Sequence, residues 1–244
     1  MTQTYPNDCL QYYVDPWWVK TEKAPKERWR LGWALVRHIS ENPFTLQVLG
    51  RTDPKEHEQA ELKIVPFDVK SPPEPRPKLP VAALPLREKE HYCVQRGKVR
   101  PVLILAKTGT KIEAEYQQLL RSKLHHPLYL VAPFYGVDQD GSRAGIPNEF
   151  VQRVKTCEYS QYLWDMLPTG GGRQSVLRLD QMQPIEPACC ALECTNYKLS
   201  DDAGMILDDW IMWHLQQVAP GADSVFATYK EGLAERPALT TSPA

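Results

Sequence analysis

The chain has 244 residues, which allows one large domain or two small ones, and its formal net charge of −1 gives no overall attraction for nucleic acid. Its hydrophobic fraction of 42% and charged fraction of 24% are typical of a soluble globular protein. The 22 prolines favour many short elements over long helices. No apolar run approaches the ~20 residues that would span a bilayer.

The amino-terminal sequence and the cysteines indicate the compartment. The first 20 residues show no basic segment followed by an apolar one, so we expect no secretory signal and no membrane association. The six cysteines form no C-x-x-C pair, and we interpret them as reduced thiols in the cytoplasm. The alternative is a metal site made by Cys189, Cys194 and a distant histidine. We expect no metal and no cofactor.

Residues 1–70 are predicted to form a small antiparallel β unit. Large side chains alternate with smaller or polar ones over residues 29–39, which is typical of a half-buried strand. Asn42 and Pro43 supply a turn, after which residues 44–49 and 62–67 provide two more strands. We interpret the aromatic residues between Tyr12 and Trp18 as packing residues, with stacking on nucleotide bases as the alternative.

A proline-rich segment marks the expected domain boundary. Residues 71–80 contain five prolines and are predicted to be a semi-rigid linker of polyproline II character. The second domain is then expected over residues 81–220. Residues 221–244 are predicted to be a partly disordered tail.

The second domain is predicted to combine short strands with helices. Strand patterns occupy residues 91–94, 102–105, 128–134 and 175–181. One helix is predicted over residues 113–121. Another begins at Pro147, and its apolar stripe is extended or repeated by residues 159–167.

The last helix has the clearest start signal. Ser200 is the expected N-cap, followed by acidic residues in the first turn, and Pro220 ends the helix. His214 lies on its apolar face and is interpreted as a core histidine. Between the helices, Gly170–Gly172 is expected to be a flexible hinge and not a phosphate-binding loop, because no Lys-Ser/Thr follows it.

Arg178 and Asp180 are the residue pair of greatest chemical interest. They stand two apart in a predicted strand, so they share one face while Leu177 and Leu179 point into a core. Such a pair is either an acid/base pair or a surface salt bridge. Basic residues also gather from residue 96 onward, as a binding surface or as a solvated face: Arg96, Lys98, Arg100, Lys107, Lys111, Arg121 and Lys123.

The order of these segments resembles the PemK/MazF family of toxin ribonucleases. The segments are "RPVLIL" from Arg100, "LVAPF" from Leu130, "SVLRLDQMQPI" from Ser175, and a helix start at Leu199. The resemblance covers roughly residues 86–217. It implies a mainly β (α+β) fold: a small PemK-like, SH3-like β-barrel with a C-terminal helix and a helical insertion, preceded by the small β unit.

The resemblance also implies a function. Family members are compact dimers that cut single-stranded RNA without metal, through attack of the 2′-hydroxyl on the adjacent phosphorus. By this resemblance Asp180 is the base, Arg178 is the acid and Arg100 contacts the scissile phosphate. We expect Arg96, Lys98, Tyr135 and Lys107 to bind the RNA.

Two departures from the family pattern keep a second hypothesis open. The family strand ends in Thr-Ser where this chain has Tyr135-Gly136, and the loop before Arg100 is much shorter. The first hypothesis is a toxin-type endoribonuclease with single-stranded RNA as substrate, an antitoxin as protein partner and a homodimeric state. The alternative is a non-catalytic module of the same fold that binds a protein partner, either an antitoxin or a topoisomerase-like target.

Overall fold

The computed structural model describes residues 4–50, 53, 55, 60–70, 90–107, 109, 113, 128–139, 145–185 and 190–234. The chain divides into two compact units, one formed by residues 1–36 with 99–244 and the other by residues 37–98. We call them the larger and the smaller unit. The predicted linker 71–80, the helix predicted over 113–121 beyond Glu113, and the end of the chain from residue 235 lie outside the described residues.

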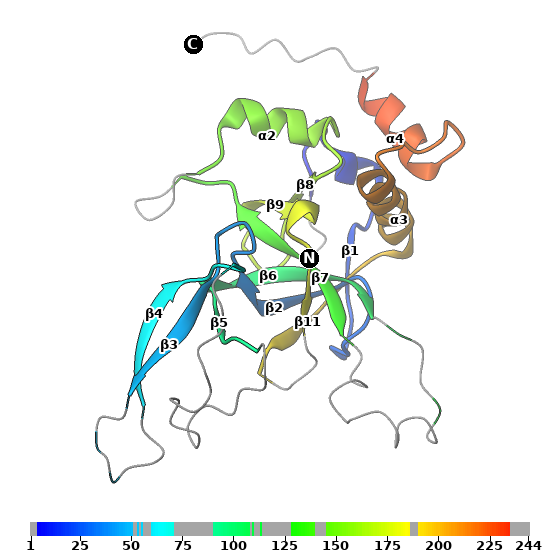
Figure 1. The fold of residues 1–244 in the computed structure, drawn as a ribbon. Coiled ribbons are helices and arrows are strands. Elements are labelled where there is room, and N and C mark those ends of the chain that lie inside the picture. The colour runs from blue at the N-terminus through cyan, green and yellow to red at the C-terminus, as the bar shows by residue number, and fades with distance from the viewer. Residues whose placement is uncertain are drawn as a thin grey trace. The chain divides into compact units, whose positions relative to one another are not determined.

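The larger unit is mainly β, with a curled antiparallel sheet that forms a half-barrel (Figure 1). The strand order is β1-β11-β2-β6-β7-β9-β8, and β10 also pairs with β7. The strands are β1 (Trp18–Lys20), β2 (Arg30–Arg37), β6 (Gly97–Lys107), β7 (Tyr129–Gly136), β8 (Tyr162–Met166), β9 (Gln174–Arg178), β10 (Gln183–Ile185) and β11 (Leu192–Leu199).

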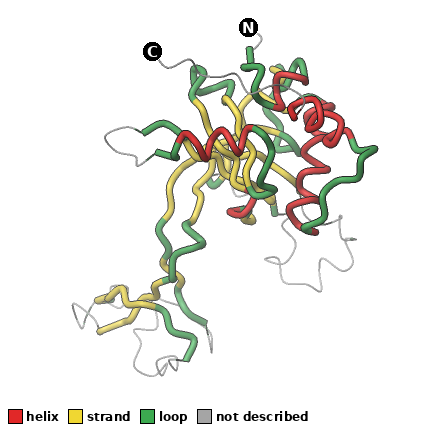
Figure 2. The backbone as a smooth tube through the Cα atoms, turned by 90° about the horizontal axis from the view of Figure 1, so that it is seen from above, coloured by secondary structure: helices red, strands yellow, loops and turns green. Residues whose placement is uncertain are grey.

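Helices gather around this sheet (Figure 2). Two short 3-10 helices are present, η1 (Leu10–Tyr13) and η4 (Leu179–Gln181). The α-helices of the described chain are α2 (Asn148–Lys155), α3 (Asp201–Gln216) and α4 (Val225–Ala234). Helix α2 contacts β8, and α3 and α4 contact each other.

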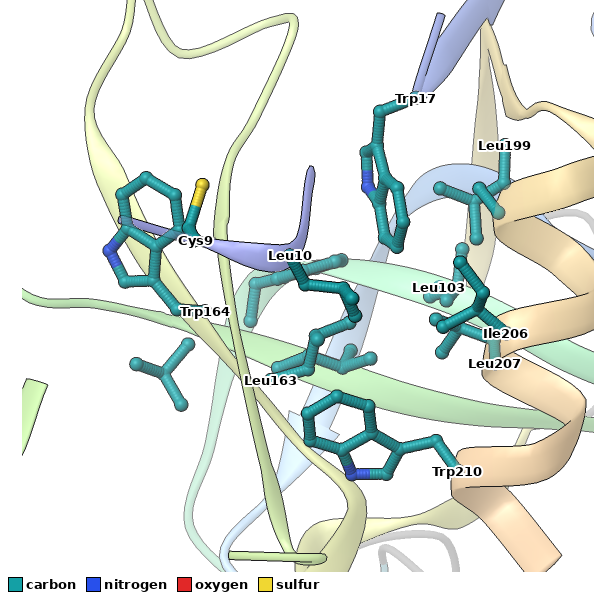
Figure 3. Close-up of a cluster of buried hydrophobic side chains, with 14 of the residues drawn as sticks. Cys9, Leu10, Trp17, Leu103, Leu163, Trp164, Leu199, Ile206, Leu207 and Trp210 are labelled. Atoms are coloured by element: carbon teal, nitrogen blue, oxygen red, sulfur yellow. The ribbon is translucent and has the colours of Figure 1, made fainter. Parts of the chain in front are cut away.

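Two hydrophobic clusters fix the sheet, because strands β6 and β7 bury both of their faces. Side chains alternate along β6, so Leu103 belongs to one cluster and its neighbours Val102 and Ile104 to the other. The first and larger cluster joins the amino-terminal segment, β8 and α3. Figure 3 shows its members converging from these elements: Leu10, Trp17, Leu163, Trp164, Ile206, Leu207 and Trp210.

Several sequence predictions are confirmed. Residues 102–105 lie in β6, residues 129–134 in β7 and residues 175–178 in β9. Helix α2 follows Pro147. Helix α3 begins after Ser200, whose hydroxyl accepts a hydrogen bond from the backbone N–H of Ala203 at 3.3 Å, and Asp201 and Asp202 stand in its first turn. The cap satisfies a backbone donor that would otherwise be unpaired.

The amino-terminal residues belong to a different unit than predicted. Strand β1 pairs with β11, and β2 lies between β11 and β6 in the larger sheet. The expected β unit of residues 1–70 is therefore divided, and only its strands after Val36 belong to the smaller unit. The reason is that alternation identifies a strand but not its partner, and the partner β11 lies about 160 residues further along the chain.

The prediction of a helix over residues 159–167 is wrong. Residues 162–166 form β8, which pairs with β9 from Tyr162 opposite Arg178 to Met166 opposite Gln174. Gly171 and Gly172 lie between the two strands with φ values of 63° and 83°, so the expected hinge is the connection of a β-hairpin. The five residues are too few for periodicity to separate a strand from a helix.

A helix lies within the tail of residues 221–244 that is predicted to be partly disordered. Residues 225–234 form α4, and Phe226 in this helix is buried against Trp210 and Trp213 of α3. Helix α3 itself ends at Gln216, before the predicted Pro220, because Gln217 adopts a left-handed conformation with φ 57°.

The smaller unit contains a three-stranded sheet of order β4-β3-β5. Its strands are β3 (Phe44–Gly50), β4 (Glu61–Pro66) and β5 (Cys93–Val94), which confirms the two strands predicted at 44–49 and 62–67 and shortens the one predicted at 91–94. The register places Leu46 opposite Ile64 and Val48 opposite Leu62, so these four apolar side chains share one face.

Candidate functional site

Four adjacent strands present arginine and tyrosine in alternation on one face of the larger sheet. Val102 of β6 lies opposite Pro133 of β7, and this register continued by two residues places Arg100 opposite Tyr135. Tyr135 lies opposite Val176 of β9, and Arg178, two residues further along β9, is on the same face as Val176. Arg178 in turn lies opposite Tyr162 of β8. We call Arg100, Tyr135, Arg178 and Tyr162 the Arg–Tyr row.

Tyr135 lies between two guanidinium groups. The Arg100 guanidinium carbon is 3.9 Å from the centroid of the Tyr135 ring, and that of Arg178 is 5.2 Å from the same centroid. Arg178 is also 5.3 Å from the centroid of the Tyr162 ring. Each contact of this kind contributes about 0.5–1 kcal/mol at exposed positions. The Tyr135 ring is therefore in contact with two guanidinium groups, those of Arg100 and Arg178.

Asp180 joins the row by folding back onto Arg178. Strand β9 ends at Arg178, and Asp180 lies in η4, so the prediction that both residues stand in one strand is wrong. They are nevertheless brought together: Arg178 Nε donates to Asp180 Oδ1 at 2.7 Å and Nη2 donates to Oδ2 at 2.5 Å. This two-bond geometry is the strong form of an arginine–carboxylate pair.

The Arg178–Asp180 pair is partly accessible to solvent. The two side chains are 29% and 26% exposed. The hydrogen bond to Asp180 raises the pKa of Arg178, although desolvation acts in the opposite direction. Each Asp180 oxygen keeps a second lone pair that can accept a proton or a hydrogen bond.

Arg100 has no acidic partner among the described residues. Its side chain is half-buried, and its Nε is buried without a hydrogen-bond partner in that part of the chain. An unneutralised guanidinium fixed on an aromatic ring is suited to bind an anion, because its planar donors match carboxylate and phosphate oxygens. Of the two arginines on Tyr135, Arg178 is paired with Asp180, and Arg100 is the one without an acidic partner among the described residues.

His214 of α3 is the histidine that is electrostatically coupled to this site. Burial lowers the pKa of His214, while the negative charge of Asp180 acts in the opposite direction. Its Nδ1 is buried and has no hydrogen-bond partner among the described residues. The sequence predicted a core histidine, and the side chain is half-buried near the edge of the core.

The other residues predicted to bind RNA do not join the row. Lys107 stands seven positions beyond Arg100 on β6, or about 23 Å along the strand, and is exposed. Arg96 belongs to the smaller unit and pairs with Glu41 at 3.5 Å. Lys98 is exposed and stands two positions before Arg100 on β6, but it makes no hydrogen bond, ion pair or cation–π contact with the four residues of the row within the described chain. The structure therefore brings together Arg100, Tyr135, Arg178 and Asp180 of the predicted set.

Tyr162 is the member of the row that sequence reasoning missed. It falls within residues 159–167, which the sequence predicts to extend or repeat a helical stripe, and a helix gives no relation between Tyr162 and Arg178. A signal was nevertheless present, because residues 162–166 and 174–178 lie symmetrically about Gly170 and each can form a short strand. Recognition of the hairpin would have placed Tyr162 opposite Arg178.

A second carboxylate, Asp165 of β8, lies in a very different environment. It is 1% exposed and accepts hydrogen bonds from the Tyr5 hydroxyl at 2.7 Å and from the indole nitrogens of Trp17 and Trp18 at 3.3 and 3.0 Å. Burial raises its pKa to about 7, although the three donors act to lower it. We call this group the Asp165 cluster.

The cysteines and possible metal ligands show no comparable arrangement. Cys9 and Cys157 are buried, and burial raises the pKa of each thiol to about 12, so both are poor nucleophiles. The described residues contain no group of three or more His, Cys, Asp and Glu placed to hold a metal ion. No helix in the same part of the chain is long and apolar enough to cross a membrane.

The Arg–Tyr row with Asp180 is accordingly the candidate site: two cations, one carboxylate and two aromatic rings on a partly exposed surface of a rigid sheet. Its chemistry suits an anionic ligand that also offers planar groups. Comparisons with protein-family models, with curated proteins and with solved structures found no match to this chain.

Proposed function

We propose that this protein is a metal-independent endoribonuclease that cuts single-stranded RNA. The observation that carries the proposal is the Arg100 guanidinium, which has no acidic partner among the described residues and is stacked on Tyr135 beside the Arg178–Asp180 pair. This arrangement offers a phosphate site within a short distance of a carboxylate that can take a proton. RNA hydrolysis through the 2′-hydroxyl requires these two components.

In the proposed reaction Asp180 accepts the proton of the ribose 2′-hydroxyl. The 2′ oxygen forms a bond to the adjacent phosphorus, and the bond from phosphorus to the 5′ oxygen of the next nucleotide breaks. The products are a 2′,3′-cyclic phosphate and a 5′-hydroxyl, which takes its proton from water. Arg100 binds the non-bridging phosphate oxygens, where negative charge increases in the transition state.

Arg178 has an electrostatic role in this proposal. The family resemblance implies that Arg178 is the acid, but its hydrogen bond to Asp180 raises its pKa and makes it a poorer proton donor. We therefore assign Arg178 to hold Asp180 in position and to stabilise charge on the phosphate. Tyr135 replaces the Thr of the family pattern and acts as the support for both guanidinium groups.

The wider family assignment is part of the same proposal. We propose a PemK/MazF-like, SH3-like barrel for the curled sheet of the larger unit, a homodimeric state, a cytoplasmic location and an antitoxin as protein partner. The curled antiparallel sheet and helix α3, which follows its last strand, support the assignment at the level of architecture.

The deciding experiment is incubation of the full chain with long single-stranded RNA in EDTA. We expect fragments that end in a 2′,3′-cyclic phosphate, and no cleavage by Arg178→Ala or Asp180→Ala. Arg173→Ala and Asp138→Ala are matched controls, because both residues are exposed and lie outside the row. Intact RNA at high concentrations of well-folded protein would exclude the enzyme.

The alternative is a non-catalytic module that binds a protein partner. The observation that favours it is the pairing of both Asp180 oxygens with Arg178, which is also what a structural ion pair requires. Under this alternative the wild-type protein leaves the RNA intact, and the only effect of Asp180→Ala is a lower stability of the protein. Measurement of cleavage and of thermal unfolding on the same variants separates the two functions.

A further inference from the structure

The Arg–Tyr row does not end at Tyr162. The Tyr162 ring contacts Phe150 of α2, with ring centroids 5.4 Å apart, and Tyr159, with centroids 6.3 Å apart. Phe150 and Tyr159 stack nearly parallel, 5.3 Å apart and inclined by 21°. The Arg153 guanidinium lies over the Tyr159 ring at 4.9 Å. Contacts therefore continue from the candidate site to the surface of α2.

These aromatic groups are held firmly but remain accessible. Phe150, Tyr159 and Tyr162 are half-buried and pack on one side against the larger hydrophobic cluster. Arg153 is exposed and is held by Glu158, whose carboxylate accepts its Nε–H at 2.7 Å. Tyr159 has Phe150 stacked on it and the Arg153 guanidinium over it, so a planar ligand reaches this ring by replacing the exposed Arg153 side chain.

The composition of this extension points to nucleotide bases. Arginine planes and tyrosine or phenylalanine rings are the side chains on which unpaired RNA bases stack. A guanidinium on a ring at an exposed position is held weakly, so a base can take its place on Tyr159. The side chain displaced from the ring is then free to contact a phosphate.

We propose that Phe150, Tyr159 and Arg153 form a binding site for the bases of single-stranded RNA beside the point of cleavage, with Tyr162 joining this site to Arg178. The inference rests on the proposed ribonuclease function and adds the place where the flanking nucleotides bind. The insertion that carries α2 thereby becomes a part of substrate recognition. A duplex is a poorer ligand, because its bases are already stacked.

The test is RNA binding by the full chain with Asp180→Asn added to prevent cleavage. A labelled single-stranded RNA of about 12 randomised nucleotides is titrated and followed by fluorescence anisotropy. We expect Tyr159→Ala to weaken binding about tenfold and Tyr159→Phe, which keeps the ring, to leave it nearly unchanged. An RNA of about four nucleotides, too short to reach both sites, is expected to show a smaller difference.

Arg153→Ala provides a second variant that carries no risk to folding, since its side chain is exposed. We expect it to leave base stacking intact and to weaken binding less than Tyr159→Ala does. Equal affinities of the parent, folded Tyr159→Ala and Arg153→Ala for the longer RNA would overturn the inference. If the chain with Asp180 intact still cleaves RNA in that case, the proposed function stands and only the flanking site fails. If no form of the protein binds or cleaves RNA, the proposed function fails as well.

Discussion

The candidate site and the Asp165 cluster show two ways in which the larger unit holds a carboxylate. Asp180 is partly exposed and is neutralised by the guanidinium of Arg178. Asp165 is fully buried and receives three hydrogen bonds from uncharged donors, all from the amino-terminal segment. Accessibility, together with an adjacent cation, makes Asp180 suited to chemistry. Burial makes Asp165 suited to a structural role, because it joins β8 to the amino-terminal segment.

The difference has an energetic origin. A buried carboxylate loses its hydration, and neutral hydrogen bonds return only part of that free energy, so the pKa of Asp165 rises to about 7. Asp180 keeps contact with solvent and pairs with the opposite charge of Arg178. A carboxylate near two cations and water can bind and react, while one enclosed by indoles anchors a segment.

The largest effect is expected from Arg100→Ala at the candidate site. Loss of a group that stabilises charge in the transition state should lower the rate of RNA cleavage about 10²–10³-fold, or roughly 3–4 kcal/mol. The free energy of unfolding should change little, since Arg100 has no ion pair within the described residues. Single-turnover kinetics measure the rate. Arg173→Ala, at an exposed arginine outside the row, is the control, and equal rates for the two variants would contradict the assignment.

At the Asp165 cluster the expected effect is on stability and not on cleavage. Asp165→Ala leaves the Tyr5, Trp17 and Trp18 donors without their acceptor, which should lower the free energy of unfolding by about 3 kcal/mol. Urea denaturation at pH 7 measures the loss, with the exposed Asp138→Ala as control. A loss below that of the control variant would show that the cluster does not anchor the amino-terminal segment.

The titration of Asp165 predicts a pH dependence. Because its folded pKa of about 7 exceeds the unfolded value of 3.8, the folded state binds more protons between these pH values. The stabilisation is complete below pH ~4 and is lost as the pH rises to ~7, by up to about 1.4 kcal/mol per pH unit. Asp165→Asn cannot titrate, so the difference in unfolding free energy between wild type and variant should fall over this range and stay constant above it. A constant difference from pH 4 to 8 would rule out the shifted pKa.

His214 is expected to produce a smaller pH effect of opposite sign. Burial lowers its pKa, so the stabilisation is present above the unfolded pKa of ~6.5 and is lost as the pH falls. The side chain is partly exposed, which limits the effect to less than about 1 kcal/mol. Urea denaturation of wild type and His214→Gln at pH 5 and pH 7.5 tests this effect. If the wild type were more stable relative to the variant at pH 5 than at pH 7.5, the lowered pKa of His214 would be contradicted.

The smallest effect is expected from Tyr135→Phe. Both guanidinium groups lie over the ring, so removal of the hydroxyl should change cleavage less than about threefold, whereas Tyr135→Leu removes the ring and about 1 kcal/mol of cation–π contact. Cleavage rates of the two variants, measured side by side, separate ring from hydroxyl. A large loss in Tyr135→Phe would mean that the hydroxyl itself takes part.

Local sequence signals determined the elements that carry the site. Strands were predicted at 102–105, 128–134 and 175–181 from runs of apolar residues bounded by proline, glycine or polar residues, and most of these residues lie in β6, β7 and β9, which carry Arg100, Tyr135 and Arg178. Ser200 likewise predicted the start of α3 through its capping hydrogen bond. These features depend on neighbouring residues alone, and for that reason the sequence reveals them.

Only the tertiary structure decided which elements lie together. The alternation of residues 29–39 does not identify β11 as the partner of β2. The short segment 162–166 is predicted to be part of a helical stripe, but its pairing with β9 makes it a strand. The Arg–Tyr row depends on the register of four strands, which long-range backbone pairing sets. The buried state of Asp165 depends in the same way on a segment more than 140 residues away, because the environment of a side chain is a property of the packed chain.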